Sequence, residues 1–105
     1  MTKKPLVAGV GMIPFTKPGQ SEPWDVMGAK AARQALEDAG IPYSDVGQAY
    51  VGYVYGDSTC GQSALYEVGL TGIPILNVNN NCATGSSALF LARQAVESGA
   101  TDVAL

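Results

Sequence analysis

The sequence predicts an α/β fold with a mainly parallel sheet and helices on both of its faces. Short apolar runs alternate along the chain with longer amphipathic segments, and such alternation is typical of parallel sheets with helical crossovers. The length of 105 residues allows one domain with a modest core. Apolar residues make up 47% of the chain and charged residues 14%, which argues against disorder.

The N-terminal third predicts one strand and one helix. Leu6–Val10 is a short apolar run that ends at a glycine, as expected of a strand buried on both faces. A helix should begin near Ser21–Pro23, because serine is a good cap and proline is tolerated in a first turn. Gly40 suits the left-handed position past the helix end, and Pro42 blocks continuation. The apolar face of this helix recurs at steps of three and four residues: Trp24, Met27, Ala31, Ala35 and Ala39.

The rest of the chain continues the alternation. We expect a strand over 49–55, a short helix over 62–70, a strand over 73–78, a helix over 83–98 and the beginning of a strand at 102–105. The last run stops as it starts. We therefore expect residues 1–105 to be a partial N-terminal domain, truncated at its C-terminal end.

Composition excludes several classes of function. The net charge is −3 and no basic patch stands out, which disfavours nucleic acid as a partner. No run of about 18 apolar residues could span a bilayer, and the broken N-terminal stretch is unlike a secretory signal. We therefore expect an intracellular protein. The chain has no histidine and two cysteines, Cys60 and Cys82. These offer no zinc-type ligand spacing, and two intracellular cysteines are more often free thiols than a disulfide.

Cys82 is the candidate catalytic residue. A buried strand runs into Asn79–Asn81, then Cys82, then a helix of small residues. A helix N-terminus has N–H groups without intrahelical partners and a dipole that favours negative charge, so this position should stabilise a thiolate. Small residues beyond the cysteine leave room for a substrate. The Cys82 N–H could also stabilise an oxyanion on a thioester carbonyl.

Other interpretations of these residues stay open. Free cysteines are often small buried hydrophobes, and the three asparagines are also compatible with a cap and a turn. Cys60 is expected in a loop or in the core. Tyr53 and Tyr55 lie on one face if their strand is regular, where they could line a pocket or pack between layers.

The stretch from Asn79 to Leu89 resembles the nucleophile segment of thiolases. More narrowly, it is similar to the thiolase domain of sterol carrier protein x and its bacterial relatives. Further stretches resemble that subgroup in the same order: 10–12, 38–43, 51–62 and 71–75.

The resemblance implies an acyltransferase that cleaves 3-oxoacyl-CoA with CoA, or condenses two acyl-CoA molecules, without a separate cofactor or metal. The residue matching Cys82 would hold the acyl group as a thioester, activated by a histidine. The resemblance also implies the N-terminal portion of a five-layered thiolase fold, a homodimer, and a cytoplasmic location, or a peroxisomal one in a eukaryote.

This chain departs from the thiolase pattern in having no histidine. Cys60 lies in a different segment from the family's second catalytic cysteine, so that role is not assigned to it. We therefore expect the chain alone to be inactive in turnover while still holding a reactive thiol. Alternative functions are a thioester-condensing synthase, a thiolase-like aldolase, a non-catalytic subunit that binds acyl-CoA or a partner chain, and a small α/β binding domain with a structural thiol.

Overall fold

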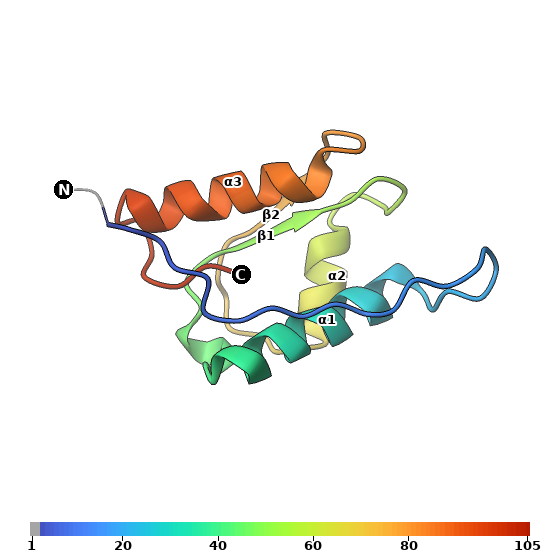
Figure 1. Cartoon of the computed structure of the whole chain (residues 1–105), viewed down its shortest axis with the longest axis horizontal. Coiled ribbons are helices and arrows are strands. Elements are labelled where there is room, and N and C mark those ends of the chain that lie inside the picture. The colour runs from blue at the N-terminus through green and yellow to red at the C-terminus, as the bar shows by residue number, and fades with distance from the viewer. Residues whose placement is uncertain (1–2) are drawn as a thin grey trace.

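The computed structural model describes residues 3–105 and has the predicted α/β class. Two strands form a parallel pair, and helices pack around it (Figure 1). The elements in chain order are α1 (Trp24–Ala39), a single 3-10 turn (Tyr43–Asp45), β1 (Ala49–Gly52), α2 (Cys60–Tyr66), β2 (Ile75–Val78) and α3 (Thr84–Glu97).

β1 has neighbours along both of its edges. On one side Ala49 lies opposite Ile75 and Gly52 opposite Val78, in parallel register. On the other side the chain end pairs with the start of β1, because Gln48 forms a parallel bridge with Ala104 and the Tyr50 N–H donates to the Leu105 carbonyl at 2.8 Å. The strand expected at 102–105 is therefore present as one parallel bridge.

Helices cover both faces of this small sheet, as predicted. Successive residues of a strand point to opposite faces. Val51 faces α2, where a Cβ added at Gly61 would lie 2.9 Å from the Val51 Cβ. Gly52 faces the start of α3. α1 packs mainly against α2. Figure 1 shows α3 on one side of the strands and both α1 and α2 on the other side.

The core is built from small side chains. Ala32 of α1, Ala49 of β1 and Leu65 of α2 form its buried centre. Partly buried residues surround them: Tyr43, Val51, Val68, Ile73, Ile75 and Leu105. Small side chains at the contact allow α1 and α2 to approach each other closely. A Cβ at Gly28 of α1 would already lie 3.0 Å from the Cβ of Ala64 of α2.

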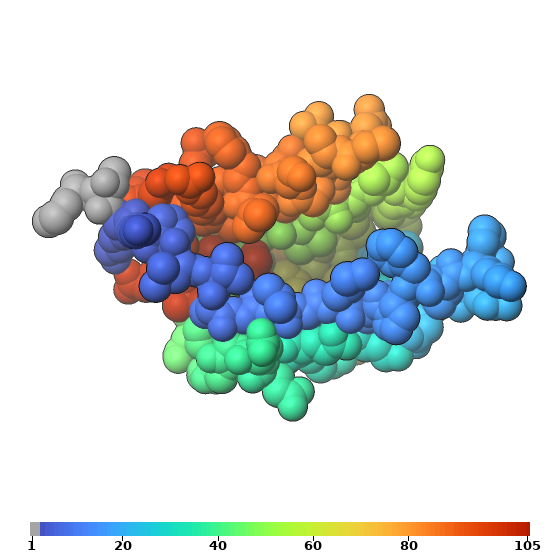
Figure 2. All heavy atoms as spheres, viewed as in Figure 1, coloured from blue at the N-terminus to red at the C-terminus, as the bar shows by residue number. Residues whose placement is uncertain are grey.

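The predicted strand at Leu6–Val10 is wrong. This segment is extended but unpaired with the sheet, and it runs along the outer surface beside α1 (Figure 2). The Val10 N–H donates to the Asp38 carboxylate at 2.9 Å, and the side chain of Leu6 is 83% exposed. The physical reason is Gly9: a Cβ there would lie 2.5 Å from the Ala35 carbonyl oxygen. The bare backbone therefore docks on the helix, while both edges of β1 are already paired.

The first helix begins and ends close to the predicted residues. It starts at Trp24 with Pro23 in the cap position. Ser21 does not cap it, since the Ser21 hydroxyl lies 2.9 Å from the Thr16 hydroxyl instead. Gly40 has φ 68° and ends the helix in the left-handed conformation that glycine adopts at low cost.

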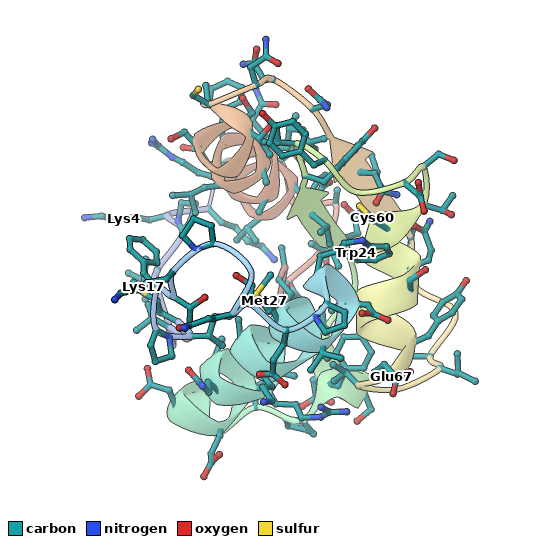
Figure 3. All side chains as sticks on the ribbon, turned by 90° about the vertical axis from the view of Figure 1, so that its right-hand side faces the viewer. Lys4, Lys17, Trp24, Met27, Cys60 and Glu67 are labelled. Carbon is teal, nitrogen blue, oxygen red and sulfur yellow. The ribbon has the colours of Figure 1, made fainter. Side chains whose placement is uncertain are left out.

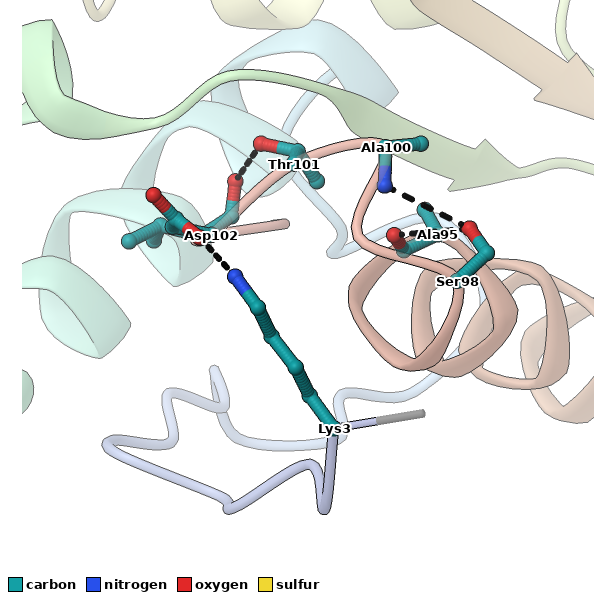
Figure 4. A network of polar contacts seen from close by, with 7 residues as sticks. Lys3, Ala95, Ser98, Ala100, Thr101 and Asp102 are labelled. Carbon is teal, nitrogen blue, oxygen red and sulfur yellow. Dashed lines mark hydrogen bonds and ion pairs between the residues drawn. The ribbon is translucent and has the colours of Figure 1, made fainter. Parts of the chain in front are cut away.

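The end of α3 and the segment around Lys3 lie side by side (Figure 4). The Lys3 N–H donates to the Glu97 carbonyl at 3.0 Å, and the Lys3 ammonium pairs with Asp102. That ammonium lowers the pKa of the Asp102 carboxyl. Both side chains are exposed, so this pair adds little to stability. No helix within residues 3–105 is long and apolar enough to cross a membrane.

Candidate active site

Cys82 lies in a tight turn directly before α3, with its side chain exposed. Two overlapping turns hold it: the Ala83 N–H donates to the Asn80 carbonyl at 3.0 Å, and the Thr84 N–H donates to the Asn81 carbonyl at 3.1 Å. Asn81 adopts φ 48°, a left-handed conformation that asparagine tolerates better than most residues. The thiol of Cys82 therefore lies at the N-terminal end of α3, the position that the sequence predicted.

The N-terminus of α3 has no side-chain cap, although the asparagines were a candidate for one. Ala83 occupies the cap position. The Asn79 side-chain carbonyl accepts the Asn81 N–H at 3.2 Å, and the Asn80 amide donates to the Ser87 hydroxyl at 2.9 Å. The asparagines therefore shape the turn rather than cap the helix. The positive end of the helix dipole remains beside Cys82.

Thr84 joins this turn to the rest of the fold, and sequence reasoning missed it. Its side chain is buried, with 6% of its surface exposed. The Thr84 hydroxyl accepts the Asn80 N–H at 2.7 Å and donates to the Tyr53 carbonyl at 3.3 Å. One hydroxyl thus links the cysteine turn to the loop after β1. A threonine among small residues has no periodic signal that would identify it in the sequence.

Cys60 has the opposite environment to Cys82. It is buried at the start of α2, and its thiol donates to the Asn77 side-chain oxygen at 3.8 Å. Burial raises the pKa of the Cys60 thiol, and the nearby Asp57 carboxylate adds to that rise against the opposing effect of two backbone N–H groups. The thiol therefore stays protonated near neutral pH. Cys60 lies in the core, one of the two places expected for it, and both cysteines are free.

An apolar groove of about 240 Å³ opens above Cys60. Figure 3 shows Trp24 of α1 close to Cys60 of α2 along this groove. Tyr53 and Tyr55 both line it, from the loop that follows β1. Tyr53 is also the residue whose carbonyl accepts the Thr84 hydroxyl, so the groove and the cysteine turn share a wall. No cluster of acidic, histidine or cysteine side chains suited to a metal ion occurs within the described residues.

Comparison with known proteins identifies the family. The family model described as "Thiolase, N-terminal domain" matches residues 6–105. Sterol carrier protein 2 of Gallus gallus is 60% identical over 107 residues, which cover 100% of this chain and 20% of that protein. The benzoylsuccinyl-CoA thiolase subunit BbsB of Thauera aromatica is 38% identical over 108 residues, covering 100% of this chain and 27% of that subunit. The chain thus spans about a fifth to a quarter of these relatives.

Solved structures agree on the fold. A 3-oxoacyl-(acyl-carrier-protein) synthase III from Aquifex aeolicus superposes with a TM-score of 0.66 at 18% identity, over 76% of this chain and 27% of that one. The priming β-ketosynthase of the R1128 polyketide pathway superposes with a TM-score of 0.60 at 28% identity, over 81% and 26%. Since the family model covers almost the whole chain, the chain belongs to the thiolase family and carries sequence of its N-terminal domain.

Proposed function

We propose that Cys82 is the nucleophile of an acyl transfer between 3-oxoacyl-CoA and CoA. The observation that carries this proposal is the placement of an exposed thiol at the uncapped N-terminus of a 14-residue helix. The thiolate is the reactive form of cysteine, and a helix N-terminus stabilises it. Cys60 also lies at a helix N-terminus, that of the seven-residue α2, but its thiol is buried and burial raises its pKa.

The proposed step conserves atoms and charge. The Cys82 thiolate attacks the 3-oxo carbonyl carbon, forming a C–S bond and an oxyanion. The Cys82 N–H is the donor proposed for that oxyanion, since the N–H groups of Ala83 and Thr84 already donate to carbonyls of the turn. Collapse of the oxyanion breaks the bond between C2 and C3, and the departing carbon takes a proton to give acetyl-CoA. The acyl group stays on Cys82 until a CoA thiol attacks it, which restores the cysteine and yields the shortened acyl-CoA.

The relatives support acyl-CoA chemistry by their names. One is a benzoylsuccinyl-CoA thiolase subunit, and a mitochondrial acetyl-CoA acetyltransferase of Mus musculus is 35% identical over 79% of this chain. These 105 residues contain Cys82 but no histidine. We therefore assign them the residue that holds the acyl group, and not the histidine that activates it. For a protein of the relatives' length we propose the full thiolysis or condensation reaction, a homodimer, and a cytoplasmic location, or a peroxisomal one in a eukaryote.

The test is acylation followed by mass spectrometry. The protein purified from its source is incubated with acetyl-CoA, and its peptides are mapped for an added acetyl group. We expect one acetyl group on Cys82, released CoA in equal amount, and loss of the label on treatment with hydroxylamine. Cys82→Ser should lose both labelling and thiolysis, and Cys60→Ser should keep both.

Acylation absent from Cys82, or thiolysis kept in Cys82→Ser, would sink the proposal. A protein that binds acyl-CoA without becoming acylated would instead fit a non-catalytic subunit. Cleavage of a carbon–carbon bond without an acyl-cysteine would fit an aldolase.

A further inference from the structure

We infer that Thr84 is a positioning residue, whose hydroxyl holds the Cys82 turn at the N-terminus of α3 in the geometry that makes the thiol reactive. This inference rests on the proposed role of Cys82 as nucleophile and adds a second residue to it. Thr84 need not touch the substrate, because it acts through the backbone on which Cys82 is carried.

The Thr84 hydroxyl joins the start of α3 to the Cys82 turn and to the loop that follows β1. Thr84 is the one buried polar side chain among residues 3–105. Its oxygen accepts the Asn80 N–H at 2.7 Å, and it donates to the Tyr53 carbonyl at 3.3 Å. Since a buried hydroxyl is costly unless it is hydrogen-bonded, both contacts hold the side chain in one orientation.

Asn80 lies at the start of the Cys82 turn. Its N–H is anchored by Thr84, and its carbonyl accepts the Ala83 N–H at 3.0 Å. Cys82 lies between Asn80 and Ala83, which these two hydrogen bonds hold in place. The direction of the Cys82 side chain therefore depends on both bonds. Without the Thr84 hydroxyl, the Asn80 N–H would lose its acceptor and the turn could shift away from the helix axis. The stabilisation of a thiolate falls off within the first turn of a helix, so a small shift should lower reactivity.

The methyl of Thr84 is fixed by packing against the end of β1. A Cβ placed on Gly52 would lie 2.3 Å from the Thr84 Cγ2, so the methyl fills the space above the end of β1. Valine retains a methyl at that place and removes only the hydroxyl. Thr84→Val therefore separates the hydrogen bonds from the packing, and Thr84→Ser keeps the hydroxyl while giving up the methyl.

The experiment measures the rate at which iodoacetamide alkylates Cys82, as a function of pH, with each cysteine followed by peptide mapping. Thr84→Val removes two hydrogen bonds, of which the one to the Asn80 N–H anchors the turn. We expect the alkylation of Cys82 near neutral pH to slow by about tenfold, the size expected for the loss of that anchoring bond. Thr84→Ser should stay within about twofold of the wild type. Ser98→Ala is the matched control, because Ser98 also donates a hydroxyl to a backbone carbonyl, that of Ala95 at 3.2 Å, but at the far end of α3. It should leave the Cys82 rate unchanged.

A Cys82 rate in folded Thr84→Val equal to that of the wild type would overturn the positioning role while leaving the proposed nucleophile intact. A wild-type Cys82 no faster than the same thiol in urea would overturn both. If Thr84→Val does not fold, hydrogen exchange in the wild type decides. The Asn80 amide should be protected although Asn80 is an exposed residue, and free exchange of that amide would contradict the inference.

Discussion

Gly52 and Thr84 lie so close together that no side chain fits between them. A Cβ at Gly52 would come within 2.3 Å of the Thr84 methyl and 2.9 Å of the Thr84 carbonyl oxygen. The end of β1 and the start of α3 are therefore in direct contact, two residues from Cys82 along the chain. This contact sets the distance between the sheet and the helix whose N-terminus carries the thiol.

Replacement of Gly52 by alanine should destabilise the fold by about 1–3 kcal/mol, the usual range for overpacking, because backbone as well as a methyl must move. Gly85→Ala is the control. A Cβ at Gly85 meets nothing within 4 Å, so alanine in this helix should raise stability by about 0.4–1 kcal/mol. Urea unfolding of both variants checks the prediction, and equal stabilities would contradict the close contact.

The side chain of Asn77 should contribute more to the free energy of unfolding than that of the exposed Asn79. The Asn77 side-chain oxygen accepts the N–H of buried Gly61 at 2.6 Å, and its amide donates to Gln62 at 2.7 Å. Asn77→Ala leaves a buried N–H without an acceptor, which costs about 1–3 kcal/mol. Asn79→Ala should cost less, since it removes one contact within an exposed turn. The midpoints of thermal unfolding rank the two, and the reverse order would refute the network.

The buried thiol of Cys60 should make the fold less stable in alkaline solution. Burial raises the pKa of this thiol in the folded state, whereas in the unfolded chain it ionises near pH 8.5. Above about pH 8.5 the unfolded chain has released the proton while the folded chain retains it. The free energy of unfolding should therefore fall as pH rises through the folded-state pKa.

Cys60→Ala is the comparison for this pH dependence. It removes the thiol, so the free energy of unfolding should decline less steeply between about pH 8.5 and 10. Other groups titrate equally in both proteins, and the difference between the two slopes isolates Cys60. Identical slopes would show that the thiol is not buried.

The sequence predicted those features that depend on a regular spacing of apolar residues or on a short run of polar and reactive residues. The spacing of Ala31, Ala35 and Ala39 predicted α1, and the order of strand, asparagines, cysteine and small residues predicted the place of Cys82. Local signals of this kind depend on residues that are near one another in the chain, so they can be recognised without knowing the fold.

The parts that sequence reasoning missed depend on contacts between distant residues. Leu6–Val10 has the composition of a buried strand, but its partner is decided by Gly9, which lets the backbone dock on α1. The role of Thr84 depends on Tyr53, 31 residues earlier. Neither pairing leaves a periodic trace, because hydrogen bonds between separate segments impose no spacing on either one.

If the fold activates Cys82, its thiol must react faster in the native protein than in the unfolded chain. The rates at which iodoacetamide alkylates Cys82 and Cys60 near neutral pH are compared in the native chain and in urea. Cys82 is exposed and Cys60 is buried, so we predict that native Cys82 reacts faster than the same residue in urea, and native Cys60 more slowly. A native Cys82 that reacts no faster than in urea would contradict its assignment as the nucleophile.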